Sequence, residues 1–279
     1  MSYMHIDNLY KRQDILAFRT CYALEKVHGT SAHVKWDKGA LTFYGGGEKH
    51  ERFAGLFNTE SLTAAFVALG HDAVTVYGEA YGGSQQGMKA TYGATLCFIA
   101  FEVQVGTAWL NVPNAADVVA KLGLEFVPYT EGPTDLVWLH AQRDAESEVA
   151  IRRGMGPGKL REGVVLRPPF EVTLANGSRL IVKHKRDEFR ETATPREVKP
   201  EQAAALGAAE AIALEWVTDE RLRHVLDKLT GEIGMERTPD VIRAMLADVE
   251  REAEGEIVVS AEARKAIGGR TVALFKAHI

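Results

Sequence analysis

The sequence has few features of a secreted or membrane protein. Its 279 residues include two cysteines, Cys21 and Cys97, which are too few for a disulfide framework or a zinc site made of cysteines. No window approaches the roughly 18 uncharged apolar residues that a spanning helix needs. The first residues are polar and charged where a signal peptide has its apolar region. These absences predict a cytoplasmic chain with reduced thiols and no membrane partner.

The chain also lacks an overall excess of positive charge. It has 33 Lys and Arg residues against 38 Asp and Glu, a formal net charge of -5, which argues against a protein that coats nucleic acid with its whole surface. The charges are unevenly distributed, because residues 152–199 hold 12 Lys and Arg but only 6 Asp and Glu. Such a segment can bind phosphates, and a solvated surface is the plainer alternative.

Residues 1–198 combine helical and strand-like patterns. Alternating apolar residues on both sides of the turn Asp37-Lys38-Gly39 predict a β-hairpin over 31–44. Other strand-like runs lie at 74–77, 96–105, 163–167, 171–174 and 179–185, with a tight turn favoured at Asn176-Gly177. Helical patterns lie at 58–69, 114–123 and 134–154. We therefore predict an α+β domain in which antiparallel sheets are flanked by helices.

Residues 199–279 have a different composition. Helix-forming residues with helical apolar spacing occur at 201–217, 219–230, 238–252 and 260–278. The change follows Pro195 and Pro200, so we place a domain boundary between residues 198 and 199. The prediction is a small, all-α C-terminal domain.

Lys26-Val27-His28-Gly29 fits the K-x-x-G pattern of nucleotidyltransferases whose lysine becomes covalently adenylated or guanylated. The pattern alone is weak, because it also occurs at 228–231 and 265–268, within the predicted helices. Only the first occurrence is followed by an ordered series of short motifs on predicted strands. These are Tyr77-Gly78-Glu79, Ala100-Phe101-Glu102, Glu162-Gly163-Val164-Val165 and Lys183-His184-Lys185.

On these motifs, the sequence resembles the covalent nucleotidyltransferase superfamily, and most closely the RNA ligase 2-like family of ATP-dependent RNA ligases. The motifs span residues 25–185, more than half of the chain, and the match is tightest at 25–30. The resemblance implies a nucleotidyltransferase (adenylation) domain with antiparallel sheets lining an ATP cleft. Lys26 would be the nucleophile that attacks the α-phosphorus as a neutral amine.

The resemblance also implies a set of nucleotide-binding residues. Glu25 and Val27 flank Lys26 within its motif, and Glu79 is placed on the ribose, where a carboxylate accepts hydroxyl hydrogen bonds. Phe101 would stack on adenine. Glu102 stands where the family often has aspartate, and is a candidate for metal or nucleotide contact. A solvated strand end for Glu79 and a plain core position for Phe101 are the alternatives.

Glu162 would hold Mg²⁺ or Mn²⁺, directly or through water, beside the reacting phosphate. Lys183 and Lys185, two apart on a strand, point to the same side and can neutralise phosphate charge during transfer. His28 is either a contact for phosphate or nucleic acid or a structural histidine. Arg186 and Arg190 are candidates for nucleic-acid contact.

The family commonly has an arginine after the first hairpin, and this chain has no clear match for it. The corresponding region, 45–52, is a glycine-rich run followed by charged residues. Lys49 or Arg52 could supply the cation, and a flexible glycine turn is the alternative.

These residues together predict an ATP-dependent RNA ligase that joins 3′-hydroxyl and 5′-phosphate ends. AMP would pass from ATP to Lys26 and then to the 5′ end, and the 3′-hydroxyl would displace it. The expected partner is RNA, as a nicked duplex or an RNA/DNA hybrid, and no protein partner is inferred. The alternatives are an ATP-dependent DNA ligase and a non-catalytic nucleic-acid-binding protein with this fold. A helical continuation disfavours DNA ligases and capping enzymes, which usually continue into a β-barrel.

Overall fold

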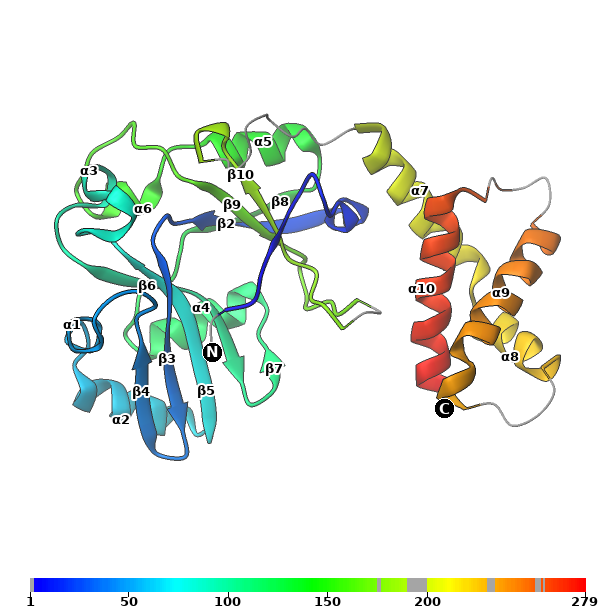
Figure 1. The fold of residues 1–279 in the computed structure, drawn as a ribbon, viewed down its shortest axis with the longest axis horizontal. Helices are drawn as coiled ribbons and strands as arrows, with labels where there is room; N and C mark the ends of the chain where they lie inside the picture. Colours follow the sequence, from blue (N-terminus) through cyan, green and yellow to red (C-terminus); the bar gives the residue numbers. More distant parts are fainter. Residues whose placement is uncertain (1–2, 175–176, 190–199, 230–233, 254–256, 258) are drawn as a thin grey trace. The chain divides into compact units, whose positions relative to one another are not determined.

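The computed structural model describes residues 3–174, 177–189, 200–229, 234–253, 257 and 259–279. The chain forms two compact units (Figure 1), one of Met1–Glu171 with Ile181–Arg196 and the other of Val172–Leu180 with Glu197–Ile279. We call them the amino-terminal unit and the helical unit. The predicted boundary between residues 198 and 199 lies outside the described residues.

Two five-stranded sheets form the framework of the amino-terminal unit (Figure 1). Sheet A has the order β1 (Asp7–Asn8), β10 (Val182–Lys185), β9 (Gly163–Arg167), β2 (Thr20–Lys26) and β8 (Tyr129–Pro133). Sheet B has the order β4 (Ala40–Tyr44), β3 (Thr30–Asp37), β5 (Ala73–Tyr81), β6 (Cys97–Val105) and β7 (Ala108–Trp109). Neighbouring strands are antiparallel except β1 and β10. The K-x-x-G motif lies where the chain passes from β2 of sheet A to β3 of sheet B.

Helices surround the sheets. They are α1 (His50–Ala54), α2 (Thr59–Leu69), α3 (Lys89–Tyr92), α4 (Val112–Lys121), α5 (Leu136–Asp144) and α6 (Glu148–Arg152), with short 3-10 turns η1 (Asp14–Ala17), η2 (Gln85–Gly87) and η3 (Asp187–Phe189). Side chains of α2 and α4 pack on one face of sheet B, where the Trp36 and Phe66 rings stack 5.8 Å apart. Val74 and Val76 of β5 point into this core. Because side chains alternate along a strand, Tyr77 and Glu79 belong to the opposite face.

The predicted α+β class is confirmed, with local differences. The helix expected from residue 114 begins at Val112, because the Asn111 side chain accepts a hydrogen bond from the Asn114 N–H and Pro113 suits a first helical turn. The helical stretch expected over 134–154 is two helices, α5 and α6. The break occurs before Ser147, whose hydroxyl oxygen accepts a hydrogen bond from the Ala150 N–H and caps α6.

The predicted hairpin over 171–185 is only partly regular. Leu174 N–H donates to Ser178 O at 2.8 Å and Leu180 N–H to Val172 O at 2.9 Å, but the paired strand β10 is limited to Val182–Lys185. Asn176, in the predicted turn, lies outside the described residues.

The helical unit contains α7 (Pro200–Trp216), α8 (Asp219–Asp227), a 3-10 turn η4 (Met235–Arg237), α9 (Thr238–Glu252) and α10 (Ala261–His278), which confirms the predicted helices. Their core includes Val217, Leu222, Met245, Ile267 and Phe275, all fully buried. No helix in the described part of the chain is both long and apolar enough to cross a membrane.

Candidate active site

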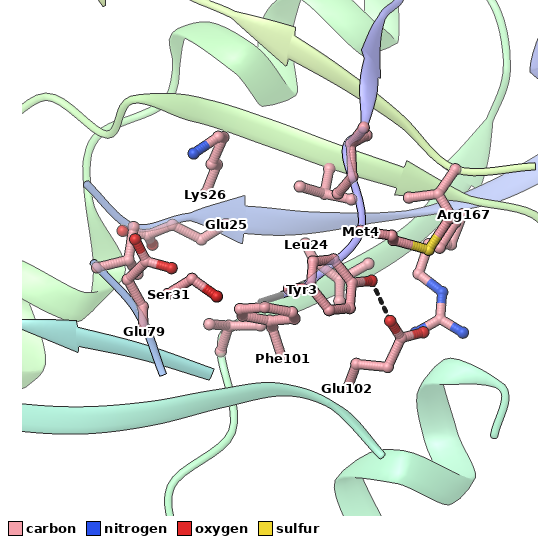
Figure 2. Close-up of a pocket in the computed structure, with 15 residues that line it drawn as sticks. Tyr3, Met4, Leu24, Glu25, Lys26, Ser31, Glu79, Phe101, Glu102 and Arg167 are labelled. Carbon is pink, nitrogen blue, oxygen red and sulfur yellow. Dashed lines mark hydrogen bonds and ion pairs between the residues drawn. The ribbon is translucent and has the colours of Figure 1, made fainter. Parts of the chain in front are cut away.

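A pocket of about 200 Å³, open to solvent, lies in the amino-terminal unit (Figure 2). Its walls come from β2, β3, β5, β6 and β9 and from the segment before β1. Six predicted site residues line it: Glu25, Lys26, Val27, Glu79, Phe101 and Glu102. Figure 2 shows Lys26 and Glu79 on one side and Glu102 on the other, with Phe101 between them.

The Glu162 carboxylate brings several predicted residues together beside the pocket. Its Oε2 lies 2.9 Å from Lys26 Nζ and 2.9 Å from His28 Nδ1, and its Oε1 lies 2.8 Å from Lys185 Nζ. The Glu162 side chain is almost fully buried. Burial would raise the pKa of Glu162, but hydrogen bonds from His28, Lys26 and Lys185 together lower it to about 2. The Glu162 carboxyl is therefore ionised at neutral pH.

Strand register explains this arrangement. Gly163 of β9 pairs with Lys26 of β2 on one side and with Lys185 of β10 on the other. The residue before it, Glu162, is therefore within reach of both lysines. Gly163 has φ +147°, and a Cβ at this position would come 2.2 Å from His184 O. Glycine is needed here because a side chain would clash with β10 and strain the backbone.

Lys183 lies on the same face of β10 as Lys185, as predicted from their spacing. Its partner in the ladder is Val165, which lines the pocket. Both motif lysines therefore belong to the side of sheet A that faces the site.

Glu79 contacts the loop of the K-x-x-G motif. Its Oε1 accepts a hydrogen bond from the Gly29 N–H at 3.2 Å. A Cβ at Gly29 would come 2.3 Å from Ala80 O and 2.9 Å from Glu79 Cγ, so only glycine allows β5 to approach this closely. Desolvation raises the pKa of Glu79 to about 7, against the lowering effect of the Lys26 charge. The Glu79 carboxyl group thus lies beside the K-x-x-G motif. It is not at a solvated strand end.

Phe101 is half-buried, and its ring faces the pocket next to Tyr3 (Figure 2). The Tyr3 and Phe101 ring centroids are 4.9 Å apart, in an edge-to-face arrangement. An aromatic face in a pocket lined by Leu24, Val127 and Ile181 suits a planar base.

Glu102 is not part of the Glu162 cluster. Its Oε1 lies 2.9 Å from Arg167 Nη1, and its Oε2 accepts a hydrogen bond from the Tyr3 hydroxyl. Arg167 Nη2 donates to Leu110 O at 2.7 Å, and Arg167 also pairs with Glu171. Metal contact by Glu102 stays a prediction. Neither Arg167 nor Tyr3 was predicted as a site residue; the available signal for Arg167 was its position at the end of the apolar run at 163–167.

The Glu25 side chain forms hydrogen bonds within the fold. It accepts hydrogen bonds from Ser147 Oγ at 2.5 Å and from the Glu148 and Val149 N–H groups at 2.9 and 3.3 Å, with Arg161 3.8 Å away. Burial raises its pKa, although Ser147 and Arg161 act in the opposite direction. The carboxylate thus stabilises the start of α6, on the face of β2 opposite Lys26. Nucleotide contact by Glu25 and Val27 stays a prediction.

His28 is held on three sides. Besides Glu162, its ring contacts Phe189 with centroids 5.2 Å apart, and its backbone N–H donates to the Tyr92 hydroxyl at 3.4 Å. The structural and functional interpretations of His28 are both compatible with this geometry. Its side chain is about 30% exposed, so one edge is open to a ligand.

The basic segment is less exposed than its charge predicts. Arg161, Arg167 and Arg179 are buried, with 4%, 2% and 6% of their surface exposed, so they contribute little to a phosphate-binding surface. Arg186 Nη1 donates to Asp144 O at 2.7 Å, and the guanidinium also pairs with Glu188. Arg190 lies outside the described residues.

The two cations considered for the missing family arginine lie at α1. Lys49 immediately precedes that helix. Arg52 pairs with Glu48 at 3.3 Å, and Glu48 accepts a hydrogen bond from Gln85 Nε2 at 2.8 Å. Gln85 Oε1 accepts one from Thr30 Oγ1 at 2.7 Å, which connects Arg52 to the residue after the K-x-x-G motif.

The donor set fits a divalent cation of the Mg²⁺ type. The described residues contain no group of three or more His, Cys, Asp or Glu side chains placed to hold a metal. Mg²⁺ is usually bound by one or two carboxylates together with waters and substrate phosphates. Glu162 can supply such a carboxylate, provided that Lys26 or His28 moves from it.

Replacing Glu79 with glutamine should change how stability depends on pH. The pKa of Glu79 is raised in the folded state, so its stabilising contribution is complete below about pH 4.5 and is lost as the pH rises through about 7. Relative to Glu79→Gln, the wild type should lose up to about 3 kcal/mol of unfolding free energy over this window. Urea unfolding at pH 5 and pH 8 measures it. Glu131→Gln, at an exposed carboxylate of β8, is the control. The prediction is contradicted if the unfolding free energies of the wild type and Glu79→Gln differ by the same amount at both pH values.

Comparisons with known proteins agree with this fold. Among solved structures, a mutant of Naegleria gruberi RNA ligase with ATP and Mn is similar with a TM-score of 0.53 and 14% identity over 68% of this chain and 56% of that one. Another mutant of that ligase, with AMP and Mn, has a TM-score of 0.53, and the same ligase with PPi has 0.52; both are 14% identical over 68% of this chain and 57% of theirs. At this identity the likeness shows the fold alone.

This chain spans just over half the length of those ligases. No curated protein sequence matches it. The family model for RNA ligase matches residues 19–185, from the start of β2 to the end of β10. That match covers more than half of the chain and contains each of the five motifs, so the protein belongs to the RNA ligase family.

Proposed function

We propose that the protein is an ATP-dependent RNA ligase that joins 3′-hydroxyl and 5′-phosphate ends through a lysyl-AMP intermediate. The observation that carries the proposal is the position of Lys26. Lys26 lines the pocket, and its amine lies 2.9 Å from a buried carboxylate that also binds Lys185. A lysine nucleophile, an anionic metal ligand and a phosphate-neutralising lysine are the groups that nucleotidyl transfer needs.

In the first step, the neutral amine of Lys26 attacks the α-phosphorus of ATP. A nitrogen–phosphorus bond forms, the bond between the α-phosphorus and the bridging oxygen breaks, pyrophosphate leaves, and the nitrogen releases a proton. In the free protein, Glu162 binds the Lys26 amine; that contact must break before the amine attacks. Lys183 and Lys185 neutralise phosphate charge as it shifts.

Different sides of the pocket bind different parts of the nucleotide. Phe101 offers its ring to adenine, and Glu79 accepts hydrogen bonds from the ribose hydroxyls. Glu162 would hold Mg²⁺ or Mn²⁺, which supplies positive charge beside the reacting phosphate. In the later steps, AMP moves from Lys26 to a 5′-phosphate, and a 3′-hydroxyl displaces it to close the phosphodiester.

The substrate we propose is RNA, as a nicked duplex or an RNA/DNA hybrid, with His28, Arg186 and Arg190 contacting it. Family membership supports RNA, and the described chain after residue 200 is helical, unlike the β-barrel that usually follows in DNA ligases. Lys26, Glu79, Glu162 and Lys185 form one connected site, which argues against a catalytically silent binding protein. A domain boundary between residues 198 and 199 and a cytoplasmic location stay predictions.

Incubation with α-labelled ATP and a divalent cation tests the first step. Wild-type protein should retain label after denaturation, and Lys26→Ala should retain none, because the alanine has no nucleophile. Lys35→Ala is the matched control, since Lys35 on β3 pairs with Asp37 at 2.8 Å and does not line the pocket. Equal labelling of Lys26→Ala, or stronger labelling with GTP than with ATP, contradicts the proposal.

Charge reversal tests the proposed RNA contacts. The double variant Arg186→Glu with Arg190→Glu should bind nicked RNA more weakly, and the slope of log affinity against log salt should become shallower by about one to two. Fluorescence anisotropy at several salt concentrations measures both quantities. Lys38→Glu with Lys121→Glu reverses two exposed charges outside the basic segment and should bind like the wild type at high salt. If Arg186→Glu with Arg190→Glu leaves the affinity and the slope unchanged, the RNA surface lies elsewhere.

A further inference from the structure

The segment before β1 forms part of the pocket although it contains none of the motifs. Tyr3, Met4 and Ile6 line the pocket. The segment is anchored immediately afterwards, because β1 pairs with β10 and the Leu9 N–H donates to Lys183 O at 2.8 Å. The same strand β10 carries the two motif lysines, so the segment and the lysines have a common support.

The Tyr3 ring lies in an aromatic cluster on the pocket face of sheet B. Its centroid is 4.9 Å from that of Phe101, 5.3 Å from Tyr77 and 6.3 Å from Trp109. The contacts with Phe101 and Trp109 are edge-to-face, an arrangement that aromatic rings favour. Tyr3 therefore has a defined position next to the ring that we assign to the base.

A buried ion pair holds the other end of Tyr3. The Tyr3 hydroxyl donates to Glu102, and Glu102 pairs with Arg167 of β9 at 2.9 Å. Glu102 and Arg167 are 1% and 2% exposed. A buried charge left without its partner is costly, so the two charged residues keep each other in place. Tyr3 is thus fixed by ring contacts on one side and by a hydrogen bond on the other.

The two ends of the pocket differ in chemistry (Figure 2). One end has Lys26 and Glu79, and at the other end Tyr3 lies against Phe101 and contacts Glu102, which pairs with Arg167. A nucleotide whose α-phosphate lies at Lys26 and whose ribose lies at Glu79 can extend its base over Phe101 only as far as Tyr3. The position of Tyr3 therefore limits the length of base that the pocket accepts.

We propose that residues 3–6 form the end wall of the base subsite, that Tyr3 determines which bases fit, and that Glu102 and Arg167 are positioning residues for Tyr3. This inference rests on the proposed use of ATP. It gives Glu102 a role in base selection, in place of metal contact.

Nucleotide binding, measured without catalysis, tests whether Tyr3 limits which bases fit the pocket. Dissociation constants for ATP and for etheno-ATP, in which a third ring is fused to adenine, are measured by calorimetry with a chelator present. Wild-type protein should bind ATP at least tenfold more tightly than etheno-ATP, because a filled pocket discriminates by such factors between ligands that differ by a small group. Tyr3→Ala should reduce the ratio to within about twofold. Tyr3→Phe keeps the ring and should retain most of the discrimination.

Tyr129→Ala is the control, because Tyr129 on β8 is 38% exposed and does not line the pocket; its ratio should equal that of the wild type. If circular dichroism shows that Tyr3→Ala does not fold, Tyr3→Leu provides the same comparison with an apolar side chain. The proposed role of Tyr3 is contradicted if the wild type binds ATP and etheno-ATP equally, or if Tyr3→Ala keeps the wild-type ratio of dissociation constants. Either result leaves the proposed use of ATP intact. A wild type that binds neither nucleotide contradicts the proposed function itself.

Discussion

The buried carboxylate of Glu162 is the interaction on which the rest of the site depends. It binds the amines of Lys26 and Lys185 and the imidazole of His28, each within 2.9 Å. An ionised group in this environment is stable only while its partners remain, and removing one partner from a buried pair typically costs about 3–5 kcal/mol. Glu162 therefore joins β2, β9 and β10 through their side chains as well as through the sheet. Lys26, which we propose as the nucleophile, and Lys185, which we propose neutralises phosphate charge, therefore lie at the same carboxylate in the free protein.

A second buried pair lies at the opposite end of the same strand. Arg167 ends β9 and reaches Glu102 on β6, so this pair connects sheet A with sheet B. Between Glu162, just before β9, and Arg167 lie the apolar side chains of the strand, of which Val165 lines the pocket. The five residues of β9 thus extend from the Glu162 cluster to the pair of Arg167 and Glu102. In the function that we propose, this short strand positions both the reacting group and the end of the base subsite.

Several parts of this site could be predicted from the sequence, and the reasons are local. The spacing of Lys183 and Lys185, the β3–β4 hairpin and the apolar run of β9 are patterns within a few residues, and the structure keeps each of them. The partners of buried charges could not be predicted in this way. Arg167 contributes to the net charge of its segment like any surface arginine, and its burial depends on Glu102, 65 positions earlier in the sequence. Glu25 lies in the best-matched motif, yet its carboxylate caps α6, because strand alternation turns it away from Lys26. Tyr3 has no periodic pattern around it and is part of the site only through tertiary contacts.

The central claim is that Lys26, and no other lysine, receives the adenylate. Peptide mapping by mass spectrometry after incubation with ATP and a divalent cation tests it most directly, because Lys183 and Lys185 lie in the same site and carry the same functional group. The account predicts one adenylate per chain, on the peptide that contains Lys26. An adenylate on Lys183 or Lys185, or a protein that acquires none under these conditions, would contradict it.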